Sequence, residues 1–129
     1  MSKNGTDRDI ALAILTQLTA LDTALSQYNR NLYAAIIFTQ PTDQTAAIGT
    51  DAVFTISAGN VASYQWQYKS TPEDPYWSDS GLSGATTDTF TVSVTDYRYD
   101  YIYRCKITGK DGSVIYSNEV HILEPEANG

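Results

Sequence analysis

The chain has 129 residues, a single cysteine and a formal net charge of −7. This length suits one domain, or a small domain with an appendage, and the single cysteine excludes an internal disulfide. The negative charge lies within residues 36–129, which hold five basic and twelve acidic residues, and it argues against binding to nucleic acid or to an anionic membrane.

Residues 7–33 have the pattern of one long helix. Thr6 is a suitable N-cap, Asp9 can complete a capping box with it, and no proline follows until Pro41. Apolar side chains then recur at alternating steps of three and four residues, which is the heptad of a coiled-coil seam. The seam positions are Ala11, Ile14, Leu18, Leu21, Leu25, Tyr28, Leu32 and Ala35.

We predict that residues 1–35 form an assembly or anchoring helix. The expected interface consists of Ile14, Leu18, Leu21, Leu25, Tyr28 and Leu32. Three interpretations stay open: the helix folds back over the following domain, associates with copies of itself as a trimer or larger bundle, or docks onto a different protein. Asp7 and Asp9 in the basic N-terminal region argue against a secretory signal peptide, and Asp22 with the polar threonines argues against a membrane span.

From residue 36 onward the apolar period changes from 3.5 to 2, which predicts β-strands. We therefore expect a strand-rich domain at residues 36–123 and a polar tail at residues 124–129. One alternating strand is expected at residues 52–58, and the last strand is expected to run from about Ser113 to Leu123. Side chains expected to face the core include Phe54, Ile56, Trp66, Phe90, Val92, Val94, Tyr103, Cys105 and Ile107.

Two short stretches identify the architecture of this domain. A Trp in Tyr64-Gln65-Trp66-Gln67, and a Tyr two residues before a Cys in Tyr103-Arg104-Cys105, are typical of an immunoglobulin-type β-sandwich. From about residue 36 to 123 the chain resembles bacterial and bacteriophage immunoglobulin-like domains. Other stretches that carry the resemblance are Gln40-Pro41, Gly49, Trp77, Thr89 to Val94 and Tyr116-Ser117-Asn118.

The resemblance implies a particular core. Ile56 stands where antibody-type domains carry the partner cysteine, so Cys105 is expected as a buried thiol beside Trp66. Tyr103 is expected to form the tyrosine corner, which is a structural hydrogen bond. The predicted fold class is thus mostly β, an immunoglobulin-like β-sandwich preceded by a long amphipathic helix, with a core that includes Ile56, Trp66, Tyr103 and Cys105.

A long apolar helix before a solitary immunoglobulin-like domain resembles the decoration proteins of tailed-phage capsids. That resemblance implies a structural virion protein without enzymatic activity, which is assembled in the host cytoplasm. Its expected partners are a capsid or other virion protein and further copies of itself. The neutral helix would bind the capsid shell, and the acidic sandwich would project outward from it.

We expect no catalytic residues, no cofactor and no metal site. His121 alternates with Val120 and Ile122 and should face outward, with no nucleophile placed beside it by any motif. No stretch has the spacing of an EF-hand calcium loop, a zinc site or a phosphate-binding loop, although a calcium site between loops stays open.

Four aromatic residues outside the expected core, Tyr76, Trp77, Tyr97 and Tyr99, allow two interpretations. They could face a ligand and stack against sugar rings or a partner protein, or they could cap the ends of the sandwich. The first interpretation supports an alternative function, in which the chain is a binding or adhesion module that recognises, weakly, a glycan or a bacterial surface.

Overall fold

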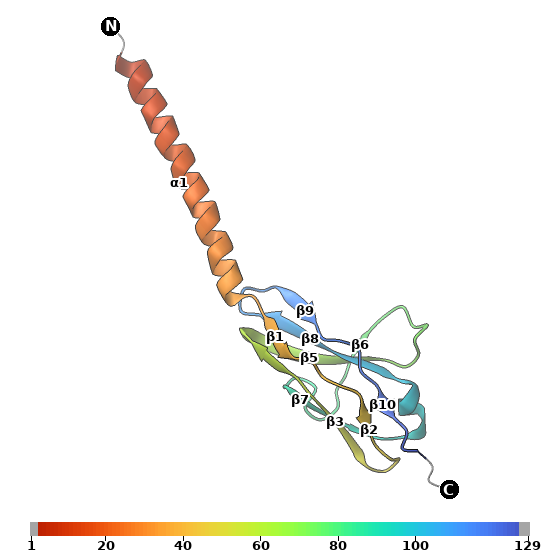
Figure 1. The fold of residues 1–129 in the computed structure, drawn as a ribbon. Coiled ribbons are helices and arrows are strands. Elements are labelled where there is room, and N and C mark those ends of the chain that lie inside the picture. The colour runs from red at the N-terminus through yellow and green to blue at the C-terminus, as the bar shows by residue number, and fades with distance from the viewer. Residues whose placement is uncertain (1–2, 127–129) are drawn as a thin grey trace. The chain divides into compact units, whose positions relative to one another are not determined.

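The computed structural model describes residues 3–126, apart from the side chains of residues 3–6 and 28–31. The chain divides into two compact units between Tyr33 and Ala34. The first unit is a helix and the second contains all the strands (Figure 1).

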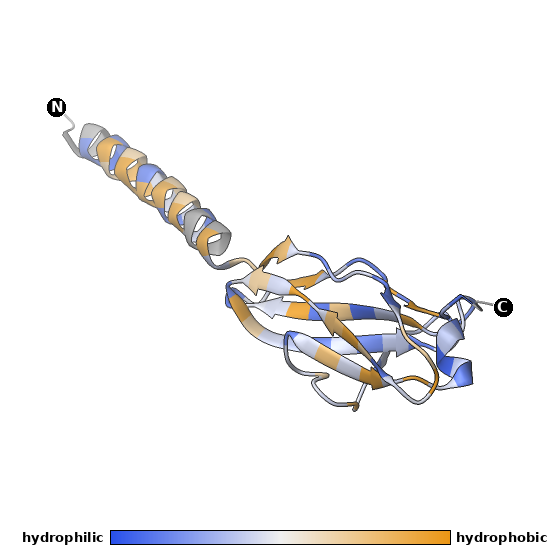
Figure 2. Ribbon diagram, turned by 60° about the horizontal axis from the view of Figure 1, so that its bottom comes forward, coloured by the Kyte–Doolittle hydropathy of each residue, from blue (hydrophilic) through white to orange (hydrophobic). Residues whose placement is uncertain are grey.

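Helix α1 extends over Lys3–Tyr33, so the predicted N-terminal helix is confirmed. Its start differs from the prediction, because Thr6 lies inside the helix and is not its N-cap. The physical reason is that no proline precedes Thr6 and that Gly5 opposes helix formation by only about 1 kcal/mol. Apolar residues occur along the described length of α1, with polar residues between them (Figure 2).

The second unit is built from short strands. The largest sheet has the order β6-β5-β8-β9, and a second sheet pairs β3 with β7; β1 pairs with β4, and β10 pairs with β2. The elements are β1 (Ile36–Thr39), β2 (Gln44–Thr45), β3 (Asp51–Thr55), β4 (Ser57–Gly59), β5 (Val61–Lys69), β6 (Ser78–Asp79), β7 (Thr89–Ser93), the 3₁₀ helix η1 (Asp96–Asp100), β8 (Ile102–Gly109), β9 (Val114–Tyr116) and β10 (Ile122–Leu123).

Two predicted strands are divided in the structure. The alternating run at residues 52–58 breaks at Ile56, because β3 pairs with β7 whereas β4 pairs with β1. The strand predicted for residues 113–123 breaks after β9, where Ser117 Oγ accepts a hydrogen bond from Cys105 N and Gln40 Oε1 accepts one from Asn118 N. These side-chain bonds interrupt the regular ladder. The chain pairs with β8 again at Val120, which exchanges two backbone hydrogen bonds with Tyr103, and β10 follows.

The end of the chain pairs with a strand near the start of the sandwich. β10 runs parallel to β2, with Ile122 opposite Gln44 and Leu123 opposite Thr45. Gln44 N donates to His121 O, and Ala46 N donates to Leu123 O, both at 3.1 Å. This parallel pair closes one edge of the sandwich.

The core lies between the two larger sheets. Trp66 on β5 is paired in register with Cys105 on β8, and both side chains are fully buried. The Trp66 ring stacks on Phe90 of β7 at 5.1 Å between ring centroids and lies 6.2 Å from the ring of Phe54 on β3. Two packed sheets with this Trp and Tyr-x-Cys arrangement form an immunoglobulin-like β-sandwich, as the sequence predicts.

Candidate functional site

The helix presents large apolar side chains to solvent. Leu21 is 63% exposed, and its seam neighbours are about equally exposed. Exposed apolar residues also occur outside the predicted seam, so the apolar surface is wider than a two-stranded coiled coil requires. The described exposed residues are Ile10, Leu12, Ile14, Leu15, Leu18, Leu21, Leu25 and Leu32, while the Tyr28 side chain lies outside the described residues.

Residues Asp7–Gln27 form a helix that is long and apolar enough to cross a membrane, judged by length and composition alone. This finding weakens the argument that the threonines exclude a membrane span. Thr16 Oγ1 donates to Leu12 O at 2.9 Å, and Thr19 Oγ1 donates to Leu15 O at 3.0 Å. Both hydroxyls therefore have partners within the helix and need none from water.

The predicted core residues Ile56, Trp66, Tyr103 and Cys105 all lie buried in the sandwich. Trp66 Nε1 donates to Thr87 O at 2.8 Å, which satisfies the polar atom of this side chain. Burial raises the pKa of the Cys105 thiol to about 12. A thiol with so high a pKa is held in its protonated, unreactive form.

The predicted tyrosine-corner hydrogen bond of Tyr103 is wrong. The Tyr103 hydroxyl is buried and finds no partner among residues 3–126. Tyr103 lies on β8 and faces the core, so the centroid of its ring lies 5.5 Å from that of Phe54 and 5.8 Å from that of Phe90. Tyr99 on η1 makes a bond of the expected kind instead, because its hydroxyl donates to Ala46 O at 2.7 Å.

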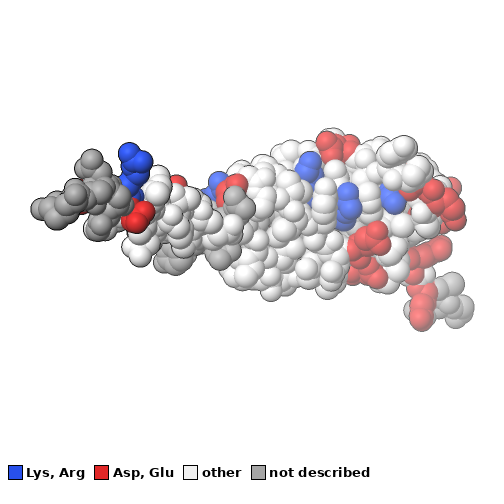
Figure 3. Space-filling model, turned by 90° about the horizontal axis from the view of Figure 1, so that it is seen from above, with Lys and Arg blue, Asp and Glu red and all other residues white. Residues whose placement is uncertain are grey.

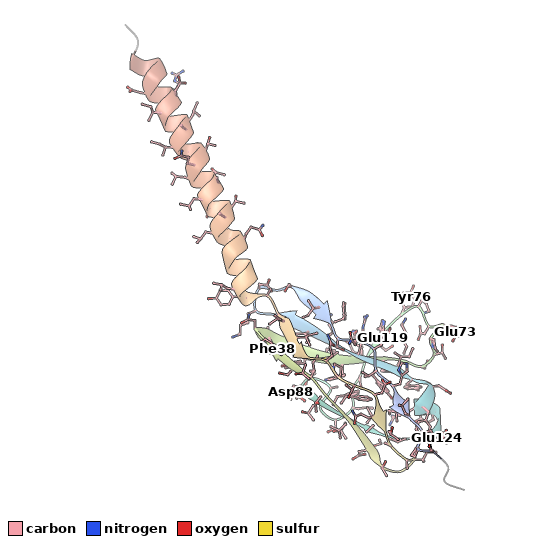
Figure 4. All side chains as sticks on the ribbon, in the orientation of Figure 1. Phe38, Glu73, Tyr76, Asp88, Glu119 and Glu124 are labelled. Carbon is pink, nitrogen blue, oxygen red and sulfur yellow. The ribbon has the colours of Figure 1, made fainter. Side chains whose placement is uncertain are left out.

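The four aromatic residues predicted to face a ligand have different contacts. Tyr76 is 76% exposed and points outward from the loop before β6, close to Glu73 (Figure 4). Trp77 packs against charged side chains of the four-stranded sheet. The ring centroid of Tyr97 lies 5.7 Å from that of Tyr101. Tyr99 is fixed by its hydrogen bond to Ala46, so it supports the fold.

A stack of aromatic and cationic side chains covers part of the four-stranded sheet. The Arg104 guanidinium lies 4.2 Å from the centroid of the Trp77 ring and 3.9 Å from that of Tyr116. Lys69 Nζ lies 5.1 Å from the same Trp77 ring. Burial lowers the pKa of Arg104, yet such a group stays charged at neutral pH. We call Lys69, Trp77, Arg104 and Tyr116 the cationic stack.

The cationic stack holds two of the five basic residues of an acidic domain, and Lys106 lies on the same face. Lys69, Arg104 and Lys106 project from β5 and β8 on the face opposite the core. Figure 3 shows Lys and Arg side chains gathered on one face of the sandwich, with Asp and Glu around them. The sequence indicates that these residues alternate with core residues along β5 and β8. It does not indicate that Trp77, in the loop between β5 and β6, packs against Lys69 and Arg104.

A pocket of about 200 Å³ lies where η1 and β8 meet the segment around β6. Tyr68 and Tyr101 stack in its wall with ring centroids 5.6 Å apart and ring planes 9° apart. The sequence did not predict this pocket, because its walls come from elements far apart along the chain. It is lined by Tyr68, Asp79, Ser80, Gly81, Leu82, Tyr97, Arg98, Tyr101 and Tyr103, and we call it the tyrosine pocket.

The described part of the structure offers no grouping of side chains that could hold a metal ion. Within residues 3–126, no three His, Cys, Asp or Glu side chains are placed to hold a metal ion. His121 Nδ1 lies 3.6 Å from Asp43 Oδ1 at the edge formed by β2 and β10, and both side chains are well exposed.

Comparisons with known proteins give one partial relative. No protein-family model matches the chain. Over 83 residues the chain is 36% identical to endoglucanase C of Cellulomonas fimi, a match that covers 63% of this chain and 7% of that protein. The chain therefore spans only a small part of this relative's length.

Solved structures with similar folds share little sequence with this chain. The first domain of Duf (Kirre) is 17% identical, with a TM-score of 0.48, and the match covers 70% of this chain and 96% of that one. A chain of the titin M10–obscurin-like 1 Ig complex is 14% identical, with a TM-score of 0.47, over 74% of this chain and 99% of that one. At such identity the likeness concerns the fold alone.

Proposed function

We propose that this chain is a non-catalytic display protein, in which α1 fastens the molecule into an assembly and the immunoglobulin-like domain is presented. The observation that carries the proposal is the row of exposed leucines and isoleucines along α1. Burying one such side chain contributes about 1.5–3 kcal/mol, so several together can offset the about 4–15 kcal/mol that association costs.

The partner we propose for α1 is further copies of α1 in a trimer or larger bundle. The apolar surface extends beyond Leu18, Leu21 and Leu25 to Leu12 and Leu15, which favours a helix covered on more than one side. The positions flanking the seam carry almost no charge, so a bundle would hold no network of interhelical ion pairs.

The finer proposal is that this assembly belongs to a bacteriophage particle. The chain would decorate the capsid in the virion, with capsid or another virion protein as a second partner of α1. What supports this is the resemblance of the arrangement, a neutral apolar helix before a single acidic sandwich, to tailed-phage decoration proteins.

The non-catalytic part of the proposal is supported by the placement of the reactive side chains. The only cysteine is fully buried, and the side chain of the only histidine, His121, lies beside the Asp43 carboxylate. A hydrolase of the nucleophilic kind needs a nucleophile within hydrogen-bond reach of its base.

The experiment is a measurement of solution mass by light scattering on the full chain and on residues 34–129. We expect the full chain to be an oligomer and residues 34–129 to be a monomer. A monomeric full chain would contradict self-association. Flotation of the full chain with neutral phosphatidylcholine vesicles would show instead that residues 7–27 enter a membrane.

Point variants locate the interface on the helix. Leu21→Asp and Leu25→Asp place a charge in the seam and should convert the oligomer to a monomer while the sandwich stays folded. Thr23→Asp is the matched control, because it adds the same charge between these positions on the opposite side of the helix. Equal effects of Leu21→Asp and Thr23→Asp would rule out the predicted seam.

A second candidate function is recognition of a glycan by the sandwich. It is favoured by the partial similarity to endoglucanase C, a protein named for its action on glucans, and by two exposed aromatic side chains of the sandwich, Tyr76 and Tyr97. Such side chains provide flat apolar surfaces against which a sugar ring can pack. The two functions are compatible in one displayed domain.

A further inference from the structure

We propose that the cationic stack binds an acidic sugar, and that Arg104 holds the carboxylate of a hexuronic acid residue with its two Nη groups. This inference deepens the second candidate function, recognition of a glycan, and rests on it. It assigns the ligand to the outer face of the four-stranded sheet and names its chemical class, a saccharide that carries a carboxylate.

The first argument is that the Arg104 guanidinium is held in place. It lies 4.2 Å from the centroid of the Trp77 ring and 3.9 Å from that of Tyr116, and its Nε donates to Gln67 Oε1 at 2.9 Å. Gln67 is itself fixed, because its Nε2 donates to Asp79 Oδ1 at 2.9 Å. A guanidinium that is oriented before a ligand arrives loses less entropy when the ligand binds.

The second argument is that the other end of this guanidinium is open to solvent. The two Nη atoms of Arg104 have no hydrogen-bond or ion-pair partner among the described residues. In that part of the chain the buried side-chain polar atoms without a partner are Thr95 Oγ1 and the Tyr103 hydroxyl, so neither Nη atom is buried. Two parallel N–H groups of a guanidinium match the two oxygens of a carboxylate.

Two lysines add positive charge around Arg104. Lys106 follows it two residues later on β8, and Lys69 lies two residues beyond Gln67, which pairs with Arg104 across the sheet. None of these three cations forms an ion pair with a carboxylate among the described residues. Burial lowers the pKa of Arg104 and the nearby charge of Glu119 acts in the opposite direction, again without an ion pair. An external carboxylate would supply the missing partner.

The place of the stack on the sheet favours a sugar over an acidic peptide. β5 and β8 are the inner strands of the order β6-β5-β8-β9, so a ligand on this face meets side chains and not a free strand edge. Extended peptides usually bind a sheet at such an edge, through main-chain hydrogen bonds. A sugar carries donors and acceptors around its ring, and these can bond to the lysine ammonium groups and to the hydroxyl of the exposed Tyr116.

The excess of acidic residues elsewhere in the sandwich does not prevent this contact. Interactions between exposed charges are largely screened beyond about 8 Å at physiological ionic strength. A carboxylate seated against Arg104 therefore responds mainly to Arg104 and to the lysines beside it.

The test is isothermal titration calorimetry of the full chain with trigalacturonate and triglucuronate, at concentrations up to several millimolar. The matched ligands are the neutral methyl esters of both sugars, and triglutamate, which carries carboxylates on a peptide. We expect at least one triuronate to bind, and its methyl ester to bind about ten-fold more weakly because it has lost the charge. Binding of neither triuronate, equal binding of an acid and its ester, or tighter binding of triglutamate would overturn the proposal.

Variants decide whether the sugar occupies the cationic stack. Arg104→Lys keeps the charge and removes the paired N–H groups, so it should weaken triuronate binding by about ten-fold. Lys106→Met keeps a side chain of similar length without its charge and should weaken binding by about three-fold. Lys110→Met is the matched control, because it removes the same charge from the hairpin that follows β8, and it should bind as the unmodified chain does.

Thermal unfolding of each variant separates lost binding from lost folding. Unchanged binding in a folded Arg104→Lys would refute the assignment. If Arg104→Lys does not fold, the comparison of Lys106→Met with Lys110→Met decides, and equal binding by these two variants would refute it.

Cellotetraose, a neutral sugar, separates this inference from the candidate function on which it rests. Binding of cellotetraose without binding of a triuronate would support recognition of a glycan and overturn the role of the cationic stack. Binding of no saccharide would reject both. The stack variants should leave the solution mass unchanged, so the assembly role of α1 is tested separately through Leu21→Asp.

Discussion

Trp66 and Trp77 contribute to the sandwich in different ways. Trp66 is fully buried, stacks on Phe90 and donates a hydrogen bond to Thr87 O. Trp77 lies at the surface, where its ring contacts the charged ends of Lys69 and Arg104. Side chains of the same kind therefore have unequal weight in the stability of one domain.

Trp66→Ala should lower the free energy of unfolding by about 3–5 kcal/mol, because it removes a buried ring and leaves a cavity. Trp77→Ala is the matched control and should cost only about 1 kcal/mol, the worth of surface cation–π contacts. Urea denaturation followed by circular dichroism measures both. Similar losses in the two variants would show that the core is not centred on Trp66.

The Cys105 thiol should make stability fall in alkali. Its pKa is raised by burial from an ordinary value of 9.0 to about 12. Below pH 9 the thiol keeps its proton in both the folded and the unfolded protein. Above 9 only the unfolded state loses it, so the free energy of unfolding should fall by about 1 kcal/mol per pH unit up to the folded pKa. Cys105→Ser, whose hydroxyl does not ionise, should show a shallower fall in urea titrations at successive pH values.

Residue-scale prediction from sequence succeeded where a strand pattern decides the environment. Alternation along β5 and β8 indicates that Trp66 and Cys105 face inward, and both are buried. It could not indicate where a hydroxyl finds its partner. Tyr99 and Tyr103 differ in this respect because one lies on η1 near Ala46 and the other within β8, and only the folded chain sets those distances.

Among the elements, the turn between β6 and β7 depends on one glycine. Gly84 has a φ of +77°, and a Cβ atom there would lie 1.9 Å from Thr89 O. The turn also includes a hydrogen bond from Thr87 N to Gly84 O at 3.0 Å. Both the backbone conformation and the close approach require the absence of a side chain.

Gly84→Ala should therefore lower the free energy of unfolding by about 2–5 kcal/mol, from backbone strain and a steric clash together. Gly112→Ala is the matched control, because its φ is +85° and no atom lies within 4 Å of the Cβ position. The control should cost about 1–2 kcal/mol, from strain alone. Thermal unfolding of the two variants side by side makes the comparison, and equal losses would mean that the chain around Thr89 can move aside.

Element-scale prediction was limited by pairing between distant segments. The alternation at residues 52–58 is continuous in sequence, yet these residues form two strands, because β3 pairs with β7 and β4 pairs with β1. The tyrosine pocket escaped prediction for the same reason, as Tyr68, Asp79, Tyr97 and Tyr103 come from four separate elements. Helix α1 was predictable because its pattern is local.

At the scale of the whole molecule, the core of the sandwich is complete without the helix. The buried apolar residues run from Ala35 to Ile122 and all belong to the second unit. The helix carries no net charge, while residues 36–129 carry the full excess of acidic residues. The two units thus differ both in packing and in the surface that they offer.

Deleting residues 1–33 should therefore change the free energy of unfolding of the sandwich by less than about 0.5 kcal/mol. Chemical denaturation of the full chain and of residues 34–129, followed by Trp fluorescence, makes the comparison, since both Trp66 and Trp77 lie in the sandwich. A loss of several kcal/mol on deletion would indicate that α1 covers a face of its own domain, the first of the three interpretations of the helix.

The parallel pairing of β2 with β10 has a mechanical consequence. A pull that enters the domain at Ala34 and leaves after Leu123 acts on two strands that run in the same direction, so it drags them past each other along their length. The bonds from Gln44 N to His121 O and from Ala46 N to Leu123 O then bear the load together and must rupture together. Tyr99 holds the same Ala46 through its carbonyl oxygen, which adds a third bond at this point. A domain that is pulled through its two ends is thus reinforced where its last strand pairs with a strand near its start.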